Sequence, residues 1–237
     1  MVIDKNRIII GALILLFFLI GFLFKLDLFI LLIISLLIIY ELYKLSFFKK
    51  IYDYAIFIFF LFLFPIIFFN NQFISFINIF LIFLVGINLL LPNYFLKRIF
   101  LLIILIFICN FLVIYSIDRY LFYFVIFVAF FNDTIAYIFG NLLKGPLIIP
   151  QVSPKKTWSG TILSSIITFI LIYQFNYPFL ISIALSISLF FGDIFFSYIK
   201  RIINLKDFSD ILQGHGGILD RLDSMLFFLL ILNFNYL

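Results

Sequence analysis

Charged residues are scarce in this chain: Lys, Arg, Asp and Glu make up 11% of its 237 residues, whereas 67% are hydrophobic. A soluble domain carries about 25% charged residues, so the composition excludes an ordinary soluble protein and predicts a polytopic membrane protein. The single cysteine, Cys109, excludes an intramolecular disulfide and a metal cluster of thiolates. The formal net charge is +5, but the basic residues lie in short clusters between apolar runs. Such clusters indicate membrane topology and not nucleic-acid binding.

The apolar runs predict an all-α fold of about nine transmembrane helices. A span needs about 20 apolar residues, and charged, Asn or Pro clusters separate the candidates. The spans are predicted at about 8–24, 26–40, 54–69, 73–91, 99–117, 120–139, 160–175, 178–199 and 218–237. Because no small-residue cleavage site follows the first run, we expect it to be an uncleaved helix.

The basic residues predict the orientation of these spans. With nine spans and a cytoplasmic N-terminus, 14 of the 16 Lys and Arg residues fall on the inner side, and only Lys25 and Arg119 fall outside. Polar residues are rare within the spans of the first half. We therefore expect scaffold helices in residues 1–125 and a catalytic region in residues 126–237.

Two aspartates lie within predicted spans: Asp133, beside Asn132, in the sixth, and Asp193 in the eighth. A charge at mid-bilayer costs roughly 3 kcal/mol on insertion scales, so such residues are usually functional and face the protein interior. The alternative is a buried carboxylate that neighbouring polar groups merely satisfy. Ser197 and Lys200 follow Asp193 at i+4 and i+7, which predicts one polar stripe running toward the cytoplasmic end of the helix.

A glycine-rich turn that contains the only histidine, Gly214-His215-Gly216-Gly217, precedes the last predicted helix. Its backbone can approach a phosphate, and His215 can serve as a general base, a phosphate donor or a hydrogen-bonded structural residue. Asp220 and Asp223 lie three residues apart near the start of that helix and share a face. With Asp193 from another helix they would form an oxygen-rich site for Mg²⁺. Alternatively, they only complement the positive helix N-terminus.

A third polar segment precedes the seventh span. Ser153 followed by Pro154 is typical of a helix N-cap and first turn. Lys155 and Lys156 would then lie at a positive helix end, where a polyphosphate can bind. The alternative is that the two lysines are ordinary anchors at the inner end of a span.

Taken in order, the three segments resemble the phosphatidate cytidylyltransferases (CDP-diacylglycerol synthases). The resemblance rests on NDT-x-AY-x-x-G from Asn132 to Gly140, on SPKKTW-x-G from Ser153 to Gly160, and on a C-terminal pattern from Ser197 to Asp223. That last pattern reads S-x-x-K-R, K-D and H-G-G-x-x-D-R-x-D. The match covers residues 130–225 strongly and the first half only by hydropathy. Gln213 departs from the family pattern, which usually has proline there.

The resemblance implies transfer of CMP from CTP to phosphatidic acid, with CDP-diacylglycerol and pyrophosphate as products. It also implies Mg²⁺ and a second, monovalent cation such as K⁺, with Asp193, Asp220 and Asp223 as the metal site. The catalytic candidates are Asp193, Lys200, His215, Asp220 and Asp223. The candidates for binding substrate phosphates are Lys155, Lys156, Ser197, Lys200, Arg201, Gly216, Gly217 and Arg221, with Asn132 and Asp133 as polar support.

The chemistry of this transfer asks little covalent help from the protein, because metal and cationic side chains neutralise the developing charge. The phosphatidate monoester is largely ionised near neutral pH, so we expect His215 to orient and not to deprotonate it. CTP is cytosolic, and all three segments fall on the inner side. We therefore expect a multi-pass protein of a bacterial inner membrane with a cytoplasmic active site, its lipid substrate in the bilayer and no nucleic-acid partner. A homodimer is left open.

Two other classes of function stay open. The nearer one is a CTP-dependent enzyme that acts on another lipid, such as a polyprenol kinase or an ether-lipid cytidylyltransferase; the long C-terminal match favours the phosphatidate enzyme over it. A CDP-alcohol phosphotransferase is disfavoured because the chain has no D-x-x-D-G-x-x-A-R run. A cation-coupled transporter that uses Asp133 and Asp193 as ion sites would predict internal repeats, which the sequence lacks.

Overall fold

The computed structural model describes residues 16–45, 80, 84, 93–154, 156–209, 211 and 216–236, and their side chains except those of 93–98 and 234–236. Every regular element in this described part of the chain is an α-helix, and its one isolated β-bridge, between Leu147 and Thr157, belongs to no strand. The all-α prediction is therefore confirmed for these residues. The predicted spans 54–69 and 73–91 lie outside them, apart from residues 80 and 84.

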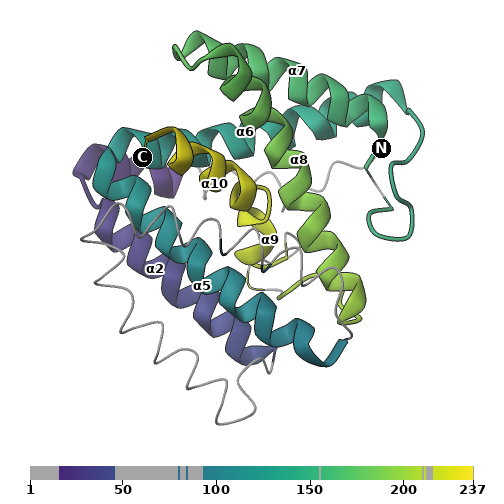
Figure 1. Cartoon of the computed structure of the whole chain (residues 1–237), viewed down its shortest axis with the longest axis horizontal. Helices are drawn as coiled ribbons and strands as arrows, with labels where there is room; N and C mark the ends of the chain where they lie inside the picture. The colour runs from purple at the N-terminus through teal and green to yellow at the C-terminus, as the bar shows by residue number, and fades with distance from the viewer. Residues whose placement is uncertain are drawn as a thin grey trace. The chain divides into compact units, whose positions relative to one another are not determined.

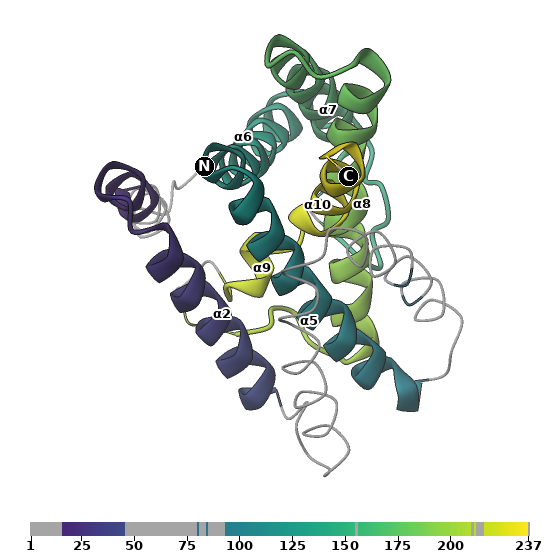
Figure 2. The ribbon, with the colours of Figure 1, turned by 60° about the vertical axis from the view of Figure 1, so that its left-hand side comes forward.

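The chain divides into two compact units: Met1–Arg119 with Asp207–Arg221, and Tyr120–Lys206 with Leu222–Leu237. In the first unit, helices α2 (Asp27–Lys44) and α5 (Asn93–Ile117) lie side by side (Figure 1, Figure 2). Arg119, two residues after the end of α5, forms an ion pair with Asp27, with 3.2 Å between Nε and Oδ2. This contact ties the beginning of α2 to the end of α5. These compact units are defined by packing alone. The predicted division into scaffold helices in residues 1–125 and a catalytic region in residues 126–237 concerns function and stays a prediction.

The second unit is built from four helices: α6 (Arg119–Leu143), which enters it at Tyr120, α7 (Trp158–Gln174), α8 (Phe179–Ile202) and α10 (Met225–Tyr236). Helix α8 packs against both α7 and α10, as Figure 1 shows. The short helix α9 (Leu219–Leu222) precedes α10. Helix α8 thus lies between α7 and the C-terminal helix in its contacts.

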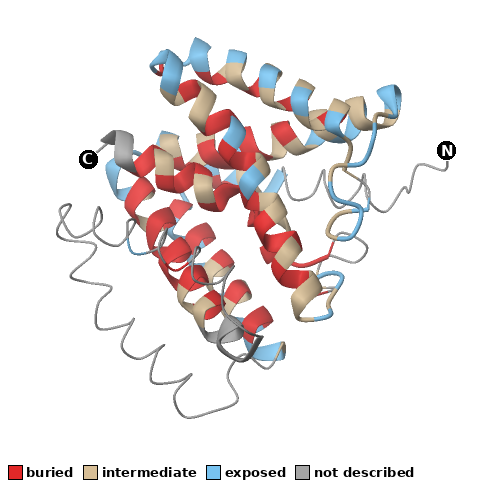
Figure 3. Cartoon of the chain, turned by 45° about the vertical axis from the view of Figure 1, so that its right-hand side comes forward, coloured by how far each residue is buried: buried red, intermediate tan, exposed pale blue. Residues whose placement is uncertain are grey.

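Helix α7 has the polarity of a membrane helix, with small and polar residues buried and large apolar residues exposed. Gly160, Ser164 and Thr168 recur every fourth residue on the buried face, and the Thr168 hydroxyl donates a hydrogen bond to the Asn132 side chain of α6 at 3.2 Å. The opposite face carries exposed isoleucines, at positions 162, 166 and 170. Small residues let membrane helices approach closely, while apolar side chains face lipid. Figure 3 shows the buried and exposed faces.

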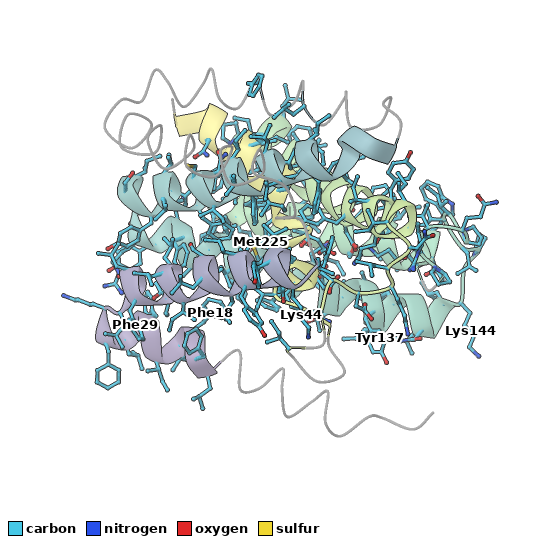
Figure 4. The ribbon with its side chains drawn as sticks, turned by 90° about the horizontal axis from the view of Figure 1, so that it is seen from below. Phe18, Phe29, Lys44, Tyr137, Lys144 and Met225 are labelled. Atoms are coloured by element: carbon cyan, nitrogen blue, oxygen red, sulfur yellow. The ribbon has the colours of Figure 1, made fainter. Side chains whose placement is uncertain are left out.

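Three helices in the described chain are long and apolar enough to cross a membrane: Ile99–Ile117, Arg119–Leu143 and Phe179–Ile202. Helix α7 is apolar but shorter. Large hydrophobic side chains lie exposed on these and other helices; Phe29 of α2 and Tyr137 of α6, labelled in Figure 4, are 60% and 63% exposed. Exposed apolar surface on this scale marks contact with lipid or protein, so the described helices are those expected of a membrane protein.

The last predicted span is not one continuous helix. A turn at Asp223 and Ser224 separates α9 from α10. The reason is local: the Asp223 carboxylate accepts the Ser224 N–H at 2.8 Å, and a continuous helix would direct that N–H to the carbonyl of residue 220. Asp220 and Asp223 therefore do not share the face of one uninterrupted helix, which corrects the expectation from their spacing.

Helix α7 also begins later than its sequence suggests. Its N-cap is Thr157, whose side chain accepts the Gly160 N–H at 3.3 Å, and not Ser153. The bridge to Leu147 explains the shift, because it holds Thr157 in an extended conformation. Hydrogen bonds on either side reinforce it, from Ile148 N–H to the Lys156 carbonyl and from Trp158 N–H to the Pro146 carbonyl. Lys156 thus precedes the helix cap and does not lie in the first turn.

Candidate active site

Two lysine–aspartate pairs form the polar centre of the second unit. Lys156, from the loop between α6 and α7, forms an ion pair with Asp193 in the middle of α8. Lys200, at the end of α8, lies 3.8 Å from the Asp223 carboxylate, measured from Nζ to Oδ2. Lys200 and Asp223 are 7% and 5% exposed, so this second pair is almost fully buried. Buried charges need such partners, because an unpaired one is costly.

The surroundings of Lys156 show that the two pairs belong to one cluster. Burial lowers the pKa of the Lys156 ammonium, and the positive charge of Lys200 adds to this effect. The negative charges of Asp223 and Asp133 act in the opposite direction and favour the charged form. Lys156 therefore interacts electrostatically with both members of the second pair and with Asp133 on α6. The cluster combines alternating charges from two helices, one loop and the turn before α10.

Helix α8 presents its polar residues as the sequence predicts. It is continuous from Phe179 to Ile202, so Asp193, Ser197 and Lys200 follow one another at helical spacing. Ser197 and Lys200 are both buried. The asparagine and aspartate of α6 lie in the same unit: Asn132 is buried and accepts the hydrogen bond from α7, and Asp133 is half-buried.

A glycine sets the distance between α8 and the turn that carries Asp223. A Cβ atom on Gly192 would lie 2.6 Å from the Asp223 carbonyl oxygen and 2.7 Å from that of Ser224. Real Cβ atoms do not approach backbone oxygens so closely, so any side chain here would push the turn away. The absence of a side chain next to Asp193 therefore allows Asp223 to reach the same cluster.

In the first unit, Asp220 holds the glycine turn. Its Oδ2 accepts the N–H groups of Phe208 and Gly217, each at 2.8 Å. Gly216 adopts φ +79°, a conformation that favours glycine. The Gly217 N–H, a candidate phosphate donor, thus already binds a carboxylate of the chain itself. Asp220 has a structural task that its spacing from Asp223 did not indicate.

A second carboxylate, which sequence reasoning missed, binds the same turn. Glu41, the only glutamate of the chain, is 0% exposed at the end of α2. It accepts hydrogen bonds from Ser209 and from the N–H groups of Ile218 and Leu219. Burial raises the pKa of Glu41, which lies beyond the predicted span 26–40, and the charge of Asp220 acts in the same direction. The three hydrogen bonds oppose this rise.

Of the remaining candidate residues, the structure describes Arg201 and Arg221. Arg201 donates to the carbonyl oxygens of Val152 and Leu205, at 3.0 and 3.1 Å, so its guanidinium holds the loop that precedes Lys156. Arg221 is half-buried in α9. Lys155 and His215 lie outside the described residues.

Convergence of three carboxylates on one metal ion stays a prediction. Asp193 and Asp223 lie in the second compact unit, whereas Asp220 lies in the first. Within the part of the chain that the structure describes, which lacks His215, no three His, Cys, Asp or Glu side chains are grouped as metal ligands.

Comparison with known proteins gives this cluster a context. Residues 5–237 match the model of the cytidylyltransferase family. The phosphatidate cytidylyltransferase of Rickettsia conorii is 41% identical over 116 residues, which cover 42% of this chain and 50% of that protein. The protein of the same name from Staphylococcus haemolyticus is 38% identical over 116 residues, or 45% of each chain. Aligned segments thus span about half the length of these relatives. Because the family model covers nearly the whole sequence, the chain belongs to the cytidylyltransferase family.

Proposed function

We propose that this chain is a phosphatidate cytidylyltransferase, which forms CDP-diacylglycerol and pyrophosphate from CTP and phosphatidic acid. Membership of the cytidylyltransferase family and relatives that carry this name support the proposal. The observation that carries it is the cluster of two lysines and two aspartates in the second unit. Cationic groups for phosphate, placed beside carboxylates for a divalent cation, are the equipment that transfer from a nucleoside triphosphate needs.

In the proposed reaction, a phosphate oxygen of phosphatidic acid forms a bond to the α-phosphorus of CTP. The bond from that phosphorus to the oxygen bridging to the β-phosphate breaks, and pyrophosphate leaves with the electron pair. Negative charge develops on the phosphate oxygens and the leaving group. Because phosphatidate enters largely ionised, the protein has to bind, orient and neutralise, and it needs no strong base. His215 is then a residue that orients a phosphate.

Lys156 and Lys200 are proposed to hold the phosphate groups. Both ammonium groups are already held in place by carboxylates, Lys156 by Asp193 and Lys200 by Asp223. Binding a phosphate would therefore cost little additional side-chain entropy. The other proposed phosphate-binding residues are Lys155, Ser197, Arg201, Gly216, Gly217 and Arg221. Asn132 and Asp133 are proposed as polar support.

The donor set suits a divalent cation. Asp193 and Asp223 offer hard carboxylate oxygens, and each faces a positive charge in this structure, so both are in places where a cation is stabilised. We propose that these two residues and Asp220 hold Mg²⁺, with a second, monovalent cation nearby. When bound, the metal would neutralise charge on the reacting phosphates.

The proposal extends to the membrane setting. Nine spans, a cytoplasmic N-terminus and an active site on the cytoplasmic side of a bacterial inner membrane would bring cytosolic CTP to a lipid head group. The division into N-terminal scaffold helices in residues 1–125 and a catalytic region in residues 126–237 belongs to the same proposal. So does a possible homodimer.

Two radiolabels test the function and separate it from its nearest rival. We expect full-length protein, supplied with phosphatidic acid and a divalent cation, to move label from α-³²P CTP into the lipid phase and none from γ-³²P CTP. A CTP-dependent lipid kinase would give the opposite pattern with a polyprenol acceptor. Lipid labelling from γ-³²P alone, or only with an ether-lipid phosphate, would reject the phosphatidate enzyme.

A further inference from the structure

The end of helix α2 carries a buried acid with no role in the proposed phosphate chemistry. Glu41 lies near the end of a mostly apolar helix and is completely shielded from solvent. A carboxylate in such a place is strongly destabilising unless hydrogen bonds satisfy it. The geometry of its partners therefore decides what it does.

The three hydrogen-bond donors to Glu41 among the described residues all come from one C-terminal segment. Oε1 accepts the Ser209 hydroxyl at 2.7 Å and the Ile218 N–H at 2.6 Å, and Oε2 accepts the Leu219 N–H at 3.0 Å. Both oxygens are used, and two of the donors are consecutive backbone groups at the start of α9. Three hydrogen bonds on one side chain hold Ser209 and the backbone at Ile218 and Leu219 next to the end of α2.

The fit leaves no spare room. A Cβ atom on Gly217 would lie 2.5 Å from Glu41 Oε1 and 2.7 Å from the Ser209 hydroxyl oxygen. A side chain at position 217 would therefore displace the Glu41 carboxylate or the Ser209 hydroxyl from its present place. The pattern of consecutive glycines is explained here by a protein carboxylate, before any ligand is considered.

Asp220 also forms hydrogen bonds that hold this turn. It accepts the Phe208 and Gly217 N–H groups, and the Phe208 ring stacks on Phe100 of α5 with 5.6 Å between centroids. The N–H groups of three consecutive residues, 217 to 219, thus all end on carboxylates. Because Asp220 is tied to this turn by the N–H of Gly217, whatever holds the turn also determines where Asp220 lies.

We propose that Glu41 is a positioning residue for the nucleotidyl transfer: by holding the Ile218 and Leu219 backbone, it fixes the turn on which Asp220 depends. This inference rests on the proposed function, in which Asp220 belongs to the metal site. It places a functional residue in the N-terminal helices, outside the segments that resemble the family pattern.

Hydrogen exchange measured by mass spectrometry tests the contact without reference to activity. Glu41→Gln keeps the shape of the side chain and one acceptor oxygen, but replaces the other oxygen with an NH2 group. That group cannot accept the hydrogen bond that Leu219 N–H now donates to Oε2. We expect faster exchange in peptides covering residues 207–221 in this variant, with a smaller effect in Ser209→Ala, which removes one of three donors. Unchanged exchange in Glu41→Gln would overturn the proposal.

Steady-state kinetics test the positioning role. Loss of a residue that orients a ligand of a metal site costs about 10–100-fold. We expect Glu41→Gln to lower kcat by this factor while KM for CTP stays within about twofold, since the lysines that bind CTP are untouched. A rise in KM at unchanged kcat would contradict this.

Asp27→Asn provides the matched control. It makes the same carboxylate-to-amide change at the opposite end of α2, where the partner is Arg119. We expect a lower melting temperature with normal exchange in 207–221 and normal kcat. If Asp27→Asn reproduced the loss of kcat, Glu41 would be a general stability residue. If wild-type protein transfers no label, the proposed function and the positioning role both fail, and exchange still reports whether Glu41 holds the turn.

Discussion

At the scale of single residues, the lysine–aspartate pairs have a feature that suits an exchange of partners. Each pair is neutral in itself, and removing one member of a buried pair leaves the other uncompensated. In the proposed reaction, the nucleotide phosphate is stabilised by a positively charged side chain and the divalent cation by a carboxylate. The lysine would then pair with the phosphate and the aspartate with the cation, so both charges would stay compensated.

Lys156 is the residue at which this idea can be tested most directly. We expect Lys156→Ala to raise KM for CTP about tenfold or more, because a charge-assisted hydrogen bond to phosphate is worth about 1.5–3 kcal/mol. Lys144→Ala is the control: this lysine is exposed in the same loop, and its removal should leave KM within twofold. Equal KM values for the two variants, measured by lipid labelling, would assign Lys156 to anchoring alone.

At the scale of elements, the close contact between α8 and the turn before α10 determines whether Asp193 and Asp223 can act together. Gly192 makes this contact possible, and Phe195 of α8 packs edge-to-face against Phe227 of α10 one turn farther on, with 6.0 Å between ring centroids. Both contacts hold α8 against α10, and Gly192 lets the backbone at Asp223 and Ser224 lie close to α8. Activity should therefore be more sensitive than folding to a small change at residue 192.

Gly192→Ala is expected to cost about 1–3 kcal/mol of unfolding free energy through overpacking and to reduce kcat strongly. The added methyl group would meet two backbone carbonyl oxygens, which cannot move aside as a flexible side chain can. Thermal unfolding and lipid labelling measure the two effects. Ile187→Ala, at an exposed position of the same helix, should change neither appreciably. Full activity in Gly192→Ala would show that the spacing of the two aspartates is not critical.

At the scale of the whole molecule, orientation in the membrane gives the proposed chemistry its access to CTP. The basic residues predict that the loop after α6 is cytoplasmic and that the loop between α7 and α8 is on the opposite side. The described structure supplies a suitable residue in each loop, Lys144 and Asn176, both exposed.

Cysteine labelling tests this orientation. In a Cys109→Ala background, which removes the only native thiol, Lys144→Cys should react with a membrane-impermeant maleimide only in inside-out vesicles. Asn176→Cys should react only in intact spheroplasts. The reverse pattern would reject the cytoplasmic N-terminus and, with it, the cytoplasmic active site.

Much of the described fold could be predicted from apolar runs, because such runs end where charged or turn-forming residues begin. The predicted span 99–117 coincides with the apolar stretch of α5, and the predicted span 178–199 differs from α8 by one residue at its start and three at its end. The start of α7 and the turn at Asp223 could not be predicted in this way. Both depend on contacts that are not visible in hydropathy: the bridge from Leu147 to Thr157, and a side chain that takes the N–H of its neighbour.

The candidate site shows the same limit. Spacing placed Asp193, Ser197 and Lys200 together because they share a helix, and α8 is continuous there. Spacing could not assign Lys156 to Asp193, since a loop brings them together. The role of Glu41 could not be predicted from spacing at all, because its hydrogen-bond partners lie 168 to 178 residues later in the sequence. The one available signal was that a chain with a single glutamate keeps it at the end of an apolar helix.

This separation also bears on how the protein is made. Ribosomes add about 5–20 residues per second, so Glu41 leaves the translation machinery on the order of ten seconds before Ser209, 168 positions later. During that interval the acid has none of its three C-terminal donors. The glycine turn is therefore completed late in biogenesis, and a nascent chain that stops before Asp207 carries an N-terminal helix whose buried carboxylate lacks all three.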